Sequence, residues 1–344
     1  MSLLPHALSI LEQRIAPLAA GMDTESAKLS QALDILCEEG LICLRRAAEF
    51  GGPATAETDF REFQEAVAAT SGTLAFLQTQ HQSGVSLIAK GDRTARSEEL
   101  LRNAHRRDSL IGIGFSQLRR PGAPILRAEP TDEGFSVTGH LPWATGFGFF
   151  VHLLVGAALP DGRSLFFIMP FADGPGVRFS EPMDLAVMGP ARTVTAEFEG
   201  YRVSASDALF TKEPDWIHAN DMLNVSLQGS FALGCAKAGI RLVRKAFEKK
   251  GISAVGDAAA SLEREWEACK ASQYADVPLE ERVRWRAWAI DLSVRCAHAA
   301  VVSQGGSANS TSSDAQRVYR EALVFSVSAQ TTPILEATLQ RLIR

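Results

Sequence analysis

Cysteine and histidine are scarce and widely spaced in this sequence, and the patterns they do not form exclude several kinds of site. The 344 residues include five cysteines, no two of which form a Cys-x-x-Cys pair, and seven histidines without a His-Glu-x-x-His or His-x-x-x-His pattern. We therefore expect reduced, mostly buried thiols and no structural or catalytic metal site. The thiols belong to Cys37, Cys43, Cys235, Cys269 and Cys296.

Long apolar runs and an excess of positive charge are also missing. The 35 Lys and Arg residues against 40 Asp and Glu residues give a formal net charge of -5. This balance argues against nucleic-acid binding, which needs a basic domain or stripe. No apolar run approaches the roughly 18 to 20 residues that span a membrane. The N-terminus lacks a basic segment followed by an unbroken apolar core, so we expect no signal peptide and a cytoplasmic protein.

The chain divides into three regions by the texture of its sequence. Residues 1–108 and 213–344 carry apolar residues at helical spacing, whereas residues 109–212 carry short apolar runs separated by Gly- and Pro-rich turns. We therefore predict an α+β fold. It has an all-helical N-terminal domain, a middle β-barrel or β-sandwich domain, and a C-terminal domain of the four-helix-bundle type.

Local patterns support this division. Gly40 follows a run of leucines at helical spacing and predicts the end of a helix. Phe60, Phe63 and Val67 share one face of the segment 57–70 at helical spacing. The segment 70–91 predicts a largely buried helix, and "DGRS" at 161–164 predicts a hairpin. One C-terminal helix presents a face of small residues that permits close packing, namely Gly229, Ala232, Gly234, Ala236 and Ala238.

Four segments, taken in order, resemble the acyl-CoA dehydrogenase superfamily. They are "LDILCEEGLICLRRAAEFGG", "GFSVTGHLPWATG", "TVTAEFEGYRVSASDAL", and "QGG" followed by "QRVYREALVFSVSAQT". They fall in the family's order across helical, β and helical regions, and together they span nearly all of the chain. The resemblance predicts the family's fold.

The resemblance implies a flavin cofactor, either FAD or FMN, held between the β-domain and the C-terminal helices of two subunits. A homodimer or homotetramer follows from it. An isoalloxazine ring needs a flat neighbour and donors near its edge, and a pyrophosphate needs approachable backbone N–H groups, which glycine permits. Each implied residue also has an ordinary interpretation, such as a core aromatic or a helix end. The implied cofactor-binding residues are Phe115, Ser116, Trp143, Thr145, Gln304, Gly305, Gly306 and Thr331.

The carboxylate that removes an α-proton in this family is missing. Family members place a glutamate nine residues after the position of Arg320, where this chain has Ala329, or near Asn224 and Val225. None of these side chains accepts a proton as a carboxylate does. Asp221 lies one turn earlier and is predicted to cap a helix.

Two further family contacts are absent. The segment "SQLRRPGAP" replaces the family's Thr-Glu-Pro and Gly-Ser-Asp, and no Arg-x-x-Phe-Gly follows the first C-terminal helix. We expect Arg119 and Arg120 to lie in a solvated basic turn, with pairing to an anion as the alternative.

These observations leave three functional hypotheses. The first is a flavin-dependent oxidoreductase acting on a small molecule, with an acyl-CoA thioester as a candidate substrate and a flavin reductase or electron-transfer protein as a candidate partner. The second is a two-component monooxygenase that uses reduced flavin and oxygen, with His81 and Ser116 as catalytic residues; a packed histidine is the alternative for His81. The third is a catalytically degenerate flavin-binding or scaffold protein.

The segment 317–334 predicts a helix that ends before Pro333. Tyr319, Leu323, Val324 and Val327 share one stripe of it. We interpret this stripe as packing and cofactor support inherited from a catalytic helix.

Overall fold

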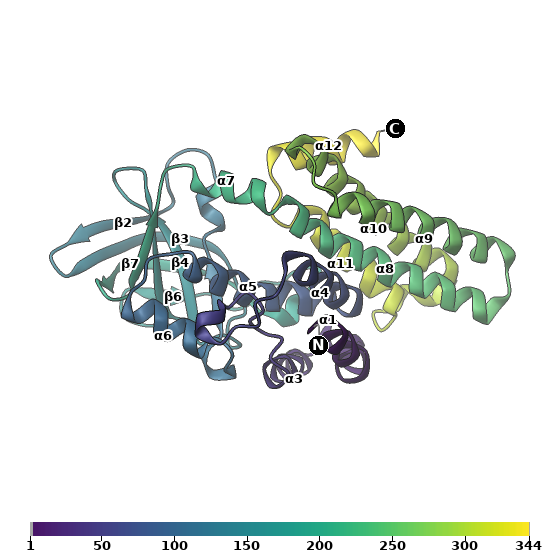
Figure 1. Ribbon diagram of the computed structural model, residues 1–344, viewed down its shortest axis with the longest axis horizontal. Helices are drawn as coiled ribbons and strands as arrows, with labels where there is room; N and C mark the ends of the chain where they lie inside the picture. Colours follow the sequence, from purple (N-terminus) through teal and green to yellow (C-terminus); the bar gives the residue numbers. More distant parts are fainter. Residues whose placement is uncertain (1–2, 344) are drawn as a thin grey trace.

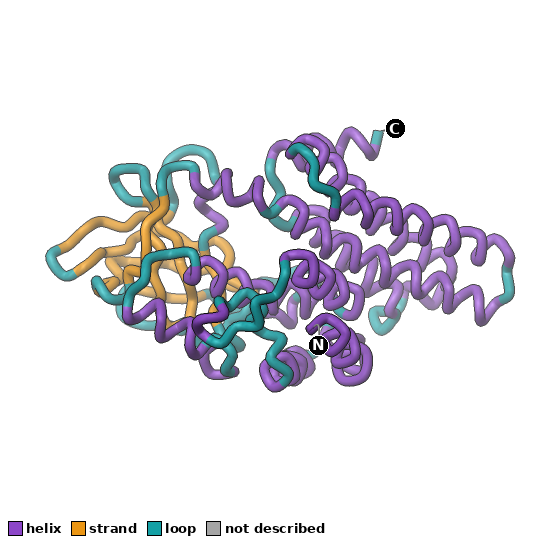
Figure 2. Tube along the Cα trace, in the orientation of Figure 1, coloured by secondary structure: helices purple, strands orange, loops and turns teal. Residues whose placement is uncertain are grey.

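The computed structural model describes residues 3–343, and these residues form helices, then strands, then helices again. Figures 1 and 2 show the strands gathered at one end of an elongated molecule and long C-terminal helices at the other, with α7 crossing between them. The predicted α+β fold class is confirmed.

The N-terminal helices bury the apolar stripes that the sequence indicated. Phe60, Phe63 and Val67 of α4 are buried, and most residues of α5 are buried as well. Gly40 adopts a left-handed backbone (φ +71°) just after α3, as expected of a residue that ends a helix. The bounds are α1 Leu3–Ile10, α2 Ala19–Met22, α3 Ser26–Glu38, α4 Glu57–Thr70, α5 Gly72–Ala89 and α6 Ala95–Asn103.

Eight strands within the described residues form one sheet. Its order is β6-β7-β3-β2-β4-β5-β8, with β1 pairing in parallel to β4. The predicted hairpin joins β4 to β5, and Gly162 supplies the positive φ of its turn. The bounds are β1 Ile111–Gly114, β2 Leu126–Thr131, β3 Gly134–Thr145, β4 His152–Ala158, β5 Ser164–Pro170, β6 Val177–Phe179, β7 Thr193–Ser204 and β8 Ala208–Lys212.

The C-terminal helices pack around α8. A break at Asn224 separates α7, which approaches the sheet, from α8, which runs through the helical bundle (Figure 1). The bounds are α7 Trp216–Leu223, α8 Val225–Lys250, α9 Ser253–Tyr274, α10 Leu279–Gln304, α11 Asp314–Val327 and α12 Thr332–Leu342.

Two glycines let α8 touch its neighbours backbone to backbone. A Cβ on Gly234 would lie 2.2 Å from the Glu65 carbonyl oxygen of α4, and a Cβ on Gly239 would lie 2.6 Å from the Cys296 carbonyl carbon of α10. Real Cβ atoms do not approach backbone atoms this closely. Replacing either glycine by any other residue would therefore push α8 away from its neighbouring helix. The predicted close packing of this face is confirmed.

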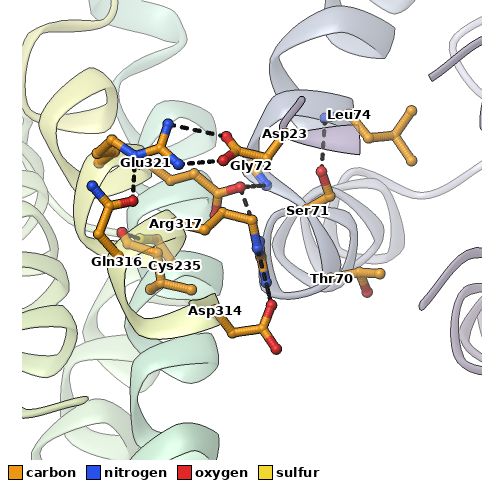
Figure 3. Close-up of polar contacts among 12 residues, drawn as sticks. Asp23, Thr70, Ser71, Gly72, Leu74, Cys235, Asp314, Gln316, Arg317 and Glu321 are labelled. Carbon is orange, nitrogen blue, oxygen red and sulfur yellow. Dashed lines mark hydrogen bonds and ion pairs between the residues drawn. The ribbon is translucent and has the colours of Figure 1, made fainter. Parts of the chain in front are cut away.

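A buried carboxylate joins the C-terminal helices to the N-terminal helices (Figure 3). Glu321 of α11 is fully buried, and its Oε1 accepts hydrogen bonds from the Gly72 backbone N–H (2.9 Å) and from Arg317 Nη1 (3.0 Å). Gly72 opens α5, where a carboxylate is favoured by the helix dipole. Ser71 completes this helix end by accepting a hydrogen bond from the Leu74 N–H.

A second ion pair runs beside the first. Arg320 of α11 pairs with Asp23, whose side chain is almost fully buried, and also donates to Gln316 Oε1 at 2.6 Å. We call Asp23, Gly72, Arg317, Arg320 and Glu321 the clamp. Every residue of the clamp is engaged by another residue of the same chain, so the Arg-x-Tyr-Arg segment holds two regions of the fold together.

The stripe on α11 differs from the prediction. Tyr319, Leu323 and Val327 are 43%, 53% and 57% exposed, whereas Val324 is partly buried against the core. The Tyr319 ring contacts the ring of His298, with centroids 5.8 Å apart. The buried face of α11 instead consists of Arg317, Val318, Glu321 and Phe325, together with two alanines. Helical spacing identified the stripe correctly but not the side that faces the core. No helix within residues 3–343 is long and apolar enough to span a membrane.

Candidate functional site

The predicted flavin strand ends in an aromatic cluster. Phe115 follows β1 and is buried; its ring meets Phe166 and Trp216 edge-on, with centroids 5.6 Å and 6.5 Å away. Ser116 begins a 3₁₀ turn and is half-buried. Because Trp216 opens α7, the cluster places the end of β1 against the first C-terminal helix.

The two other predicted residues of the sheet face different ways. Trp143 of β3 is 37% exposed, so its ring is open to a neighbour. Thr145 is buried, and its hydroxyl lies 3.0 Å from the hydroxyl of Thr193. Trp143 therefore fits an external flat ring, whereas the Thr145 hydroxyl is engaged within the sheet.

The loop after α10 carries a polar cavity of about 360 Å³. Gly305 has a left-handed φ of +78°, and a Cβ on Gly305 or Gly306 would meet nothing within 4 Å. The Gln304 side-chain oxygen accepts a hydrogen bond from the Ser313 hydroxyl at 2.9 Å. The cavity lining combines one cation and one carboxylate with an amide and four serine hydroxyls: Leu242, Lys245, Gln304, Ser307, Ser310, Ser312, Ser313 and Asp314.

The segment between α11 and α12 holds Ala329, which the resemblance places where the family has a glutamate. Ala329 adopts a left-handed backbone with φ +46°, which is strained for a residue with a Cβ. Thr331 precedes α12, and its Oγ1 is buried without a hydrogen-bond partner among the described residues. An orphaned hydroxyl of this kind fits the predicted contact with a cofactor.

Two arginines and an aspartate lie between this segment and the sheet. Arg119, at the end of the 3₁₀ turn, donates Nε and Nη2 to the two carboxylate oxygens of Asp221, both at 2.7 Å. Arg286 of α10 is 3% exposed and donates Nη2 to the Ser328 carbonyl at 2.5 Å. We call Arg119, Asp221 and Arg286 the arginine cluster.

The arginine cluster corrects two expectations. Asp221 lies inside α7 rather than at its N-cap, and it accepts a bidentate pair from an arginine 102 residues away. Arg119 is therefore paired rather than solvated, while Arg120 is exposed. Burial lowers the pKa of Arg286 to about 10, with Asp221 raising it and Arg119 lowering it. Arg286 remains a cation at neutral pH.

His81 is buried inside the helical region. Its Nδ1 accepts a hydrogen bond from the Ile111 backbone N–H at 2.9 Å, and its Nε2 lies 2.8 Å from the Ala104 carbonyl. These contacts fix the neutral tautomer that carries its proton on Nε2, and burial lowers the pKa to about 4. Both ring nitrogens are engaged, so His81 ties α5 to β1 and to the end of α6.

The cysteines are mostly buried and unpaired, as predicted from composition. Cys43, Cys235, Cys269 and Cys296 are buried, Cys37 is half-buried, and all five thiols are free. Burial raises the pKa of the Cys37, Cys269 and Cys296 thiols to about 12, so they are unreactive at neutral pH. Residues 3–343 contain no group of three or more His, Cys, Asp or Glu side chains arranged to hold a metal ion.

The structure does not bring all predicted cofactor residues to one place. Arg286 and Gln304 lie on the same helix, 18 residues apart, which corresponds to roughly 27 Å along α10. The polar cavity beside Gln304 is therefore remote from the arginine cluster in one chain. Sequence reasoning missed the arginine cluster because its members come from three separate segments.

Solved structures of acyl-CoA dehydrogenases share this fold over the whole chain. The TM-score is 0.81 to butyryl-CoA dehydrogenase from Megasphaera elsdenii, at 18% identity over 99% of this chain and 97% of that one. It is 0.82 to a glutaryl-coenzyme A dehydrogenase complexed with glutaryl-CoA, at 17% identity over 99% and 94%. It is 0.80 to FkbI, for biosynthesis of the methoxymalonyl extender unit of FK520, at 18% identity over 99% of both chains. No protein-family model and no curated protein matches the sequence. The predicted acyl-CoA dehydrogenase fold is confirmed.

Proposed function

We propose that this chain, which has the acyl-CoA dehydrogenase fold, is a flavin-dependent oxidoreductase that binds FAD, with FMN as the alternative. The observation that carries the proposal is the cavity beside Gly305 and Gly306. The glycine backbone next to the cavity, with the Lys245 ammonium and the serine hydroxyls of the lining, suits the phosphates of a flavin nucleotide, although Asp314 also lines the cavity. Bound flavin would supply the acceptor or donor of a hydride.

The residues near β1 would position the ring end of the cofactor. Phe115 and Trp143 would provide flat apolar contact, and Ser116 a hydroxyl at the ring edge. The orphaned Thr331 hydroxyl would find a partner in the cofactor. These assignments extend the predicted site residues, and they leave Thr145 as a support of the sheet.

The proposed reaction does not use a carboxylate base at either family position. Ala329, Asn224 and Val225 have no carboxyl group, and Asp221 is held by Arg119. We therefore propose a substrate or reaction other than the usual dehydrogenation, with reoxidation or reduction of the flavin by a separate protein. His81, the candidate for the monooxygenase alternative, we assign to structure because its ring nitrogens are engaged.

We also propose that the active protein is a homodimer or homotetramer. The exposed stripe Tyr319, Leu323 and Val327 of α11 suits burial against another copy. The separation of the polar cavity from the β1 residues means that one cofactor reaches both only when two copies contribute. Light scattering of the purified protein measures the state directly, and Leu323→Lys should shift it towards monomer.

Flavin binding is tested by the cofactor itself. The purified protein should show flavin absorbance, and chromatography of the released cofactor identifies FAD or FMN. Gly306→Val should abolish flavin retention while leaving the fold intact, since φ at Gly306 is not left-handed and nothing lies within 4 Å of its Cβ position. Gly189→Val is the matched control, because that glycine is equally open. A wild-type protein that takes up neither FAD nor FMN would refute the proposal.

A further inference from the structure

The arginine cluster has more positive than negative charge. Arg119 and Arg286 carry two positive charges, and Asp221 carries the one negative charge among the three. The Asp221 carboxylate is already bidentate to Arg119. Arg286, although almost fully buried, makes its hydrogen bond to a neutral carbonyl, that of Ser328. Its Nε is buried without a hydrogen-bond partner among the described residues.

A buried cation without a full counter-ion is unfavourable unless something completes it. Taking an ion out of water is unfavourable, and close pairing with hydrogen bonds offsets that cost. One further carboxylate would bring the arginine cluster to electrical neutrality. It would also offer acceptors to arginine N–H groups, which match carboxylates in geometry.

The cluster is reachable from one side. The Arg119 side chain is 25% exposed, against 6% for Asp221. Residues 120–124, which follow Arg119, are all exposed. Arg119 is therefore the member that a ligand meets first. The neighbouring Phe115 ring, 5.9 Å from the Arg119 guanidinium carbon, ties this opening to the proposed ring site.

We propose that the arginine cluster binds the carboxylate of an anionic substrate, with Arg119 and Arg286 as the specificity-determining residues. Asp221 is the internal counter-ion that occupies Arg119 in the ligand-free protein. The substrate class is then a small carboxylic acid or an acyl group that bears a free carboxylate. This inference rests on the proposed function for its reaction, but the binding of the anion does not depend on flavin.

Isothermal calorimetry of the full-length protein with sodium malonate, at constant ionic strength, tests the binding. We expect saturable binding of one malonate per chain and none of neutral dimethyl malonate. Inorganic phosphate is the second probe: phosphate binding more tightly than malonate would overturn the assignment to a carboxylate. Flavin content is measured in the same samples, so a colourless protein that binds malonate refutes only the proposed function.

Variants separate binding from a purely structural role of Arg286. Arg286→Gln should weaken the affinity for malonate at least about tenfold, and Arg286→Lys should weaken it less. Arg120→Gln, at the exposed neighbouring position, should bind malonate as the wild type does. Asp221→Asn should tighten malonate by about tenfold because it removes the internal competitor. If Arg286 only supports the Ser328 carbonyl, Arg286→Gln and Asp221→Asn leave malonate affinity unchanged, and the proposal is wrong. Should Arg286→Gln fail to fold, the Asp221→Asn result decides alone.

Discussion

The clamp and the arginine cluster are both arginine–carboxylate networks that join the C-terminal helices to another part of the chain. In the clamp, Glu321 and Asp23 each face an arginine, and Gly72 adds a helix N–H. In the arginine cluster, there are two cations for one carboxylate: Asp221 pairs with Arg119, while Arg286 bonds to a backbone carbonyl and keeps an unpartnered N–H. The clamp has one carboxylate for each arginine, although Glu321 Oε2 is buried without a hydrogen-bond partner. The arginine cluster has one carboxylate for two arginines. The difference separates a network that stabilises the fold from one that suits a ligand.

The largest effect should come from breaking the clamp. Glu321→Ala leaves Arg317 buried without its main partner and the Gly72 N–H without an acceptor. We expect a loss of about 3–5 kcal/mol in the free energy of unfolding, measured by urea denaturation. Glu336→Ala on α12 is the control, since that glutamate is exposed. Added malonate should not restore the free energy of unfolding of the Glu321→Ala variant. If it did, the clamp and the arginine cluster would respond to a ligand in the same way.

His81 is also fully hydrogen-bonded within the chain, at both ring nitrogens. Its contribution to the free energy of unfolding should depend on pH. Its pKa in the folded protein is lowered to about 4 by burial, so the unfolded chain, with an ordinary histidine, binds the proton more tightly between about pH 4 and 6.5. The stability contribution is therefore full above pH 6.5 and is lost as the pH falls towards 4.

Relative to His81→Gln, the wild-type free energy of unfolding should rise by up to about 3 kcal/mol across this window. Chemical denaturation at several pH values measures it, and His218→Gln, at an exposed position, is the control. Parallel pH profiles for wild type and His81→Gln would contradict the assignment of His81 to structure.

The arginine cluster should respond to a ligand where the clamp does not. Asp221→Asn leaves two cations without a counter-charge, and we expect a loss of about 2 kcal/mol in the free energy of unfolding. Saturating malonate should recover most of this loss. Thermal unfolding with and without malonate shows both effects, and a loss that malonate leaves in place would mean that the arginine cluster is structural like the clamp.

The smallest effect should come from the segment that Arg286 supports. Ala329 has a left-handed backbone that glycine adopts freely, so Ala329→Gly should raise the free energy of unfolding by at most about 1 kcal/mol. Denaturant midpoints measure it, with Ala337→Gly inside α12 as the opposing control, because glycine destabilises a helix. A clear destabilisation by Ala329→Gly would show that the methyl group packs.

The sequence was sufficient for the fold because periodicity reports which residues are buried along one element. Phe60, Phe63 and the small residues of α8 were identified in this way. The same periodicity left the sides of α11 ambiguous, since its buried face carries Arg317 and Glu321 and its exposed face carries apolar residues. In a single sequence, a helix face that carries charged residues is read as solvent-exposed, even where those residues are buried in ion pairs and hydrogen bonds.

The candidate site was less accessible to the sequence. The pairing of Arg119 with Asp221 joins residues 102 positions apart, and spacing alone does not reveal it. The Gln-Gly-Gly loop was identified because its glycines are local, and its flavin contacts stay a prediction. The orphaned Thr331 hydroxyl and the Arg286 Nε became visible only with tertiary packing.

The backbone contacts of Gly234 and Gly239 have a consequence for how far such a chain can diverge. At these two points the distance between helices is set by the peptide chain itself, so the neighbouring side chains are free to change as long as the glycines stay. The spacing of these helices therefore depends on a few small residues, and other positions can be substituted more freely. A chain can in this way share the fold of butyryl-CoA dehydrogenase at 18% identity.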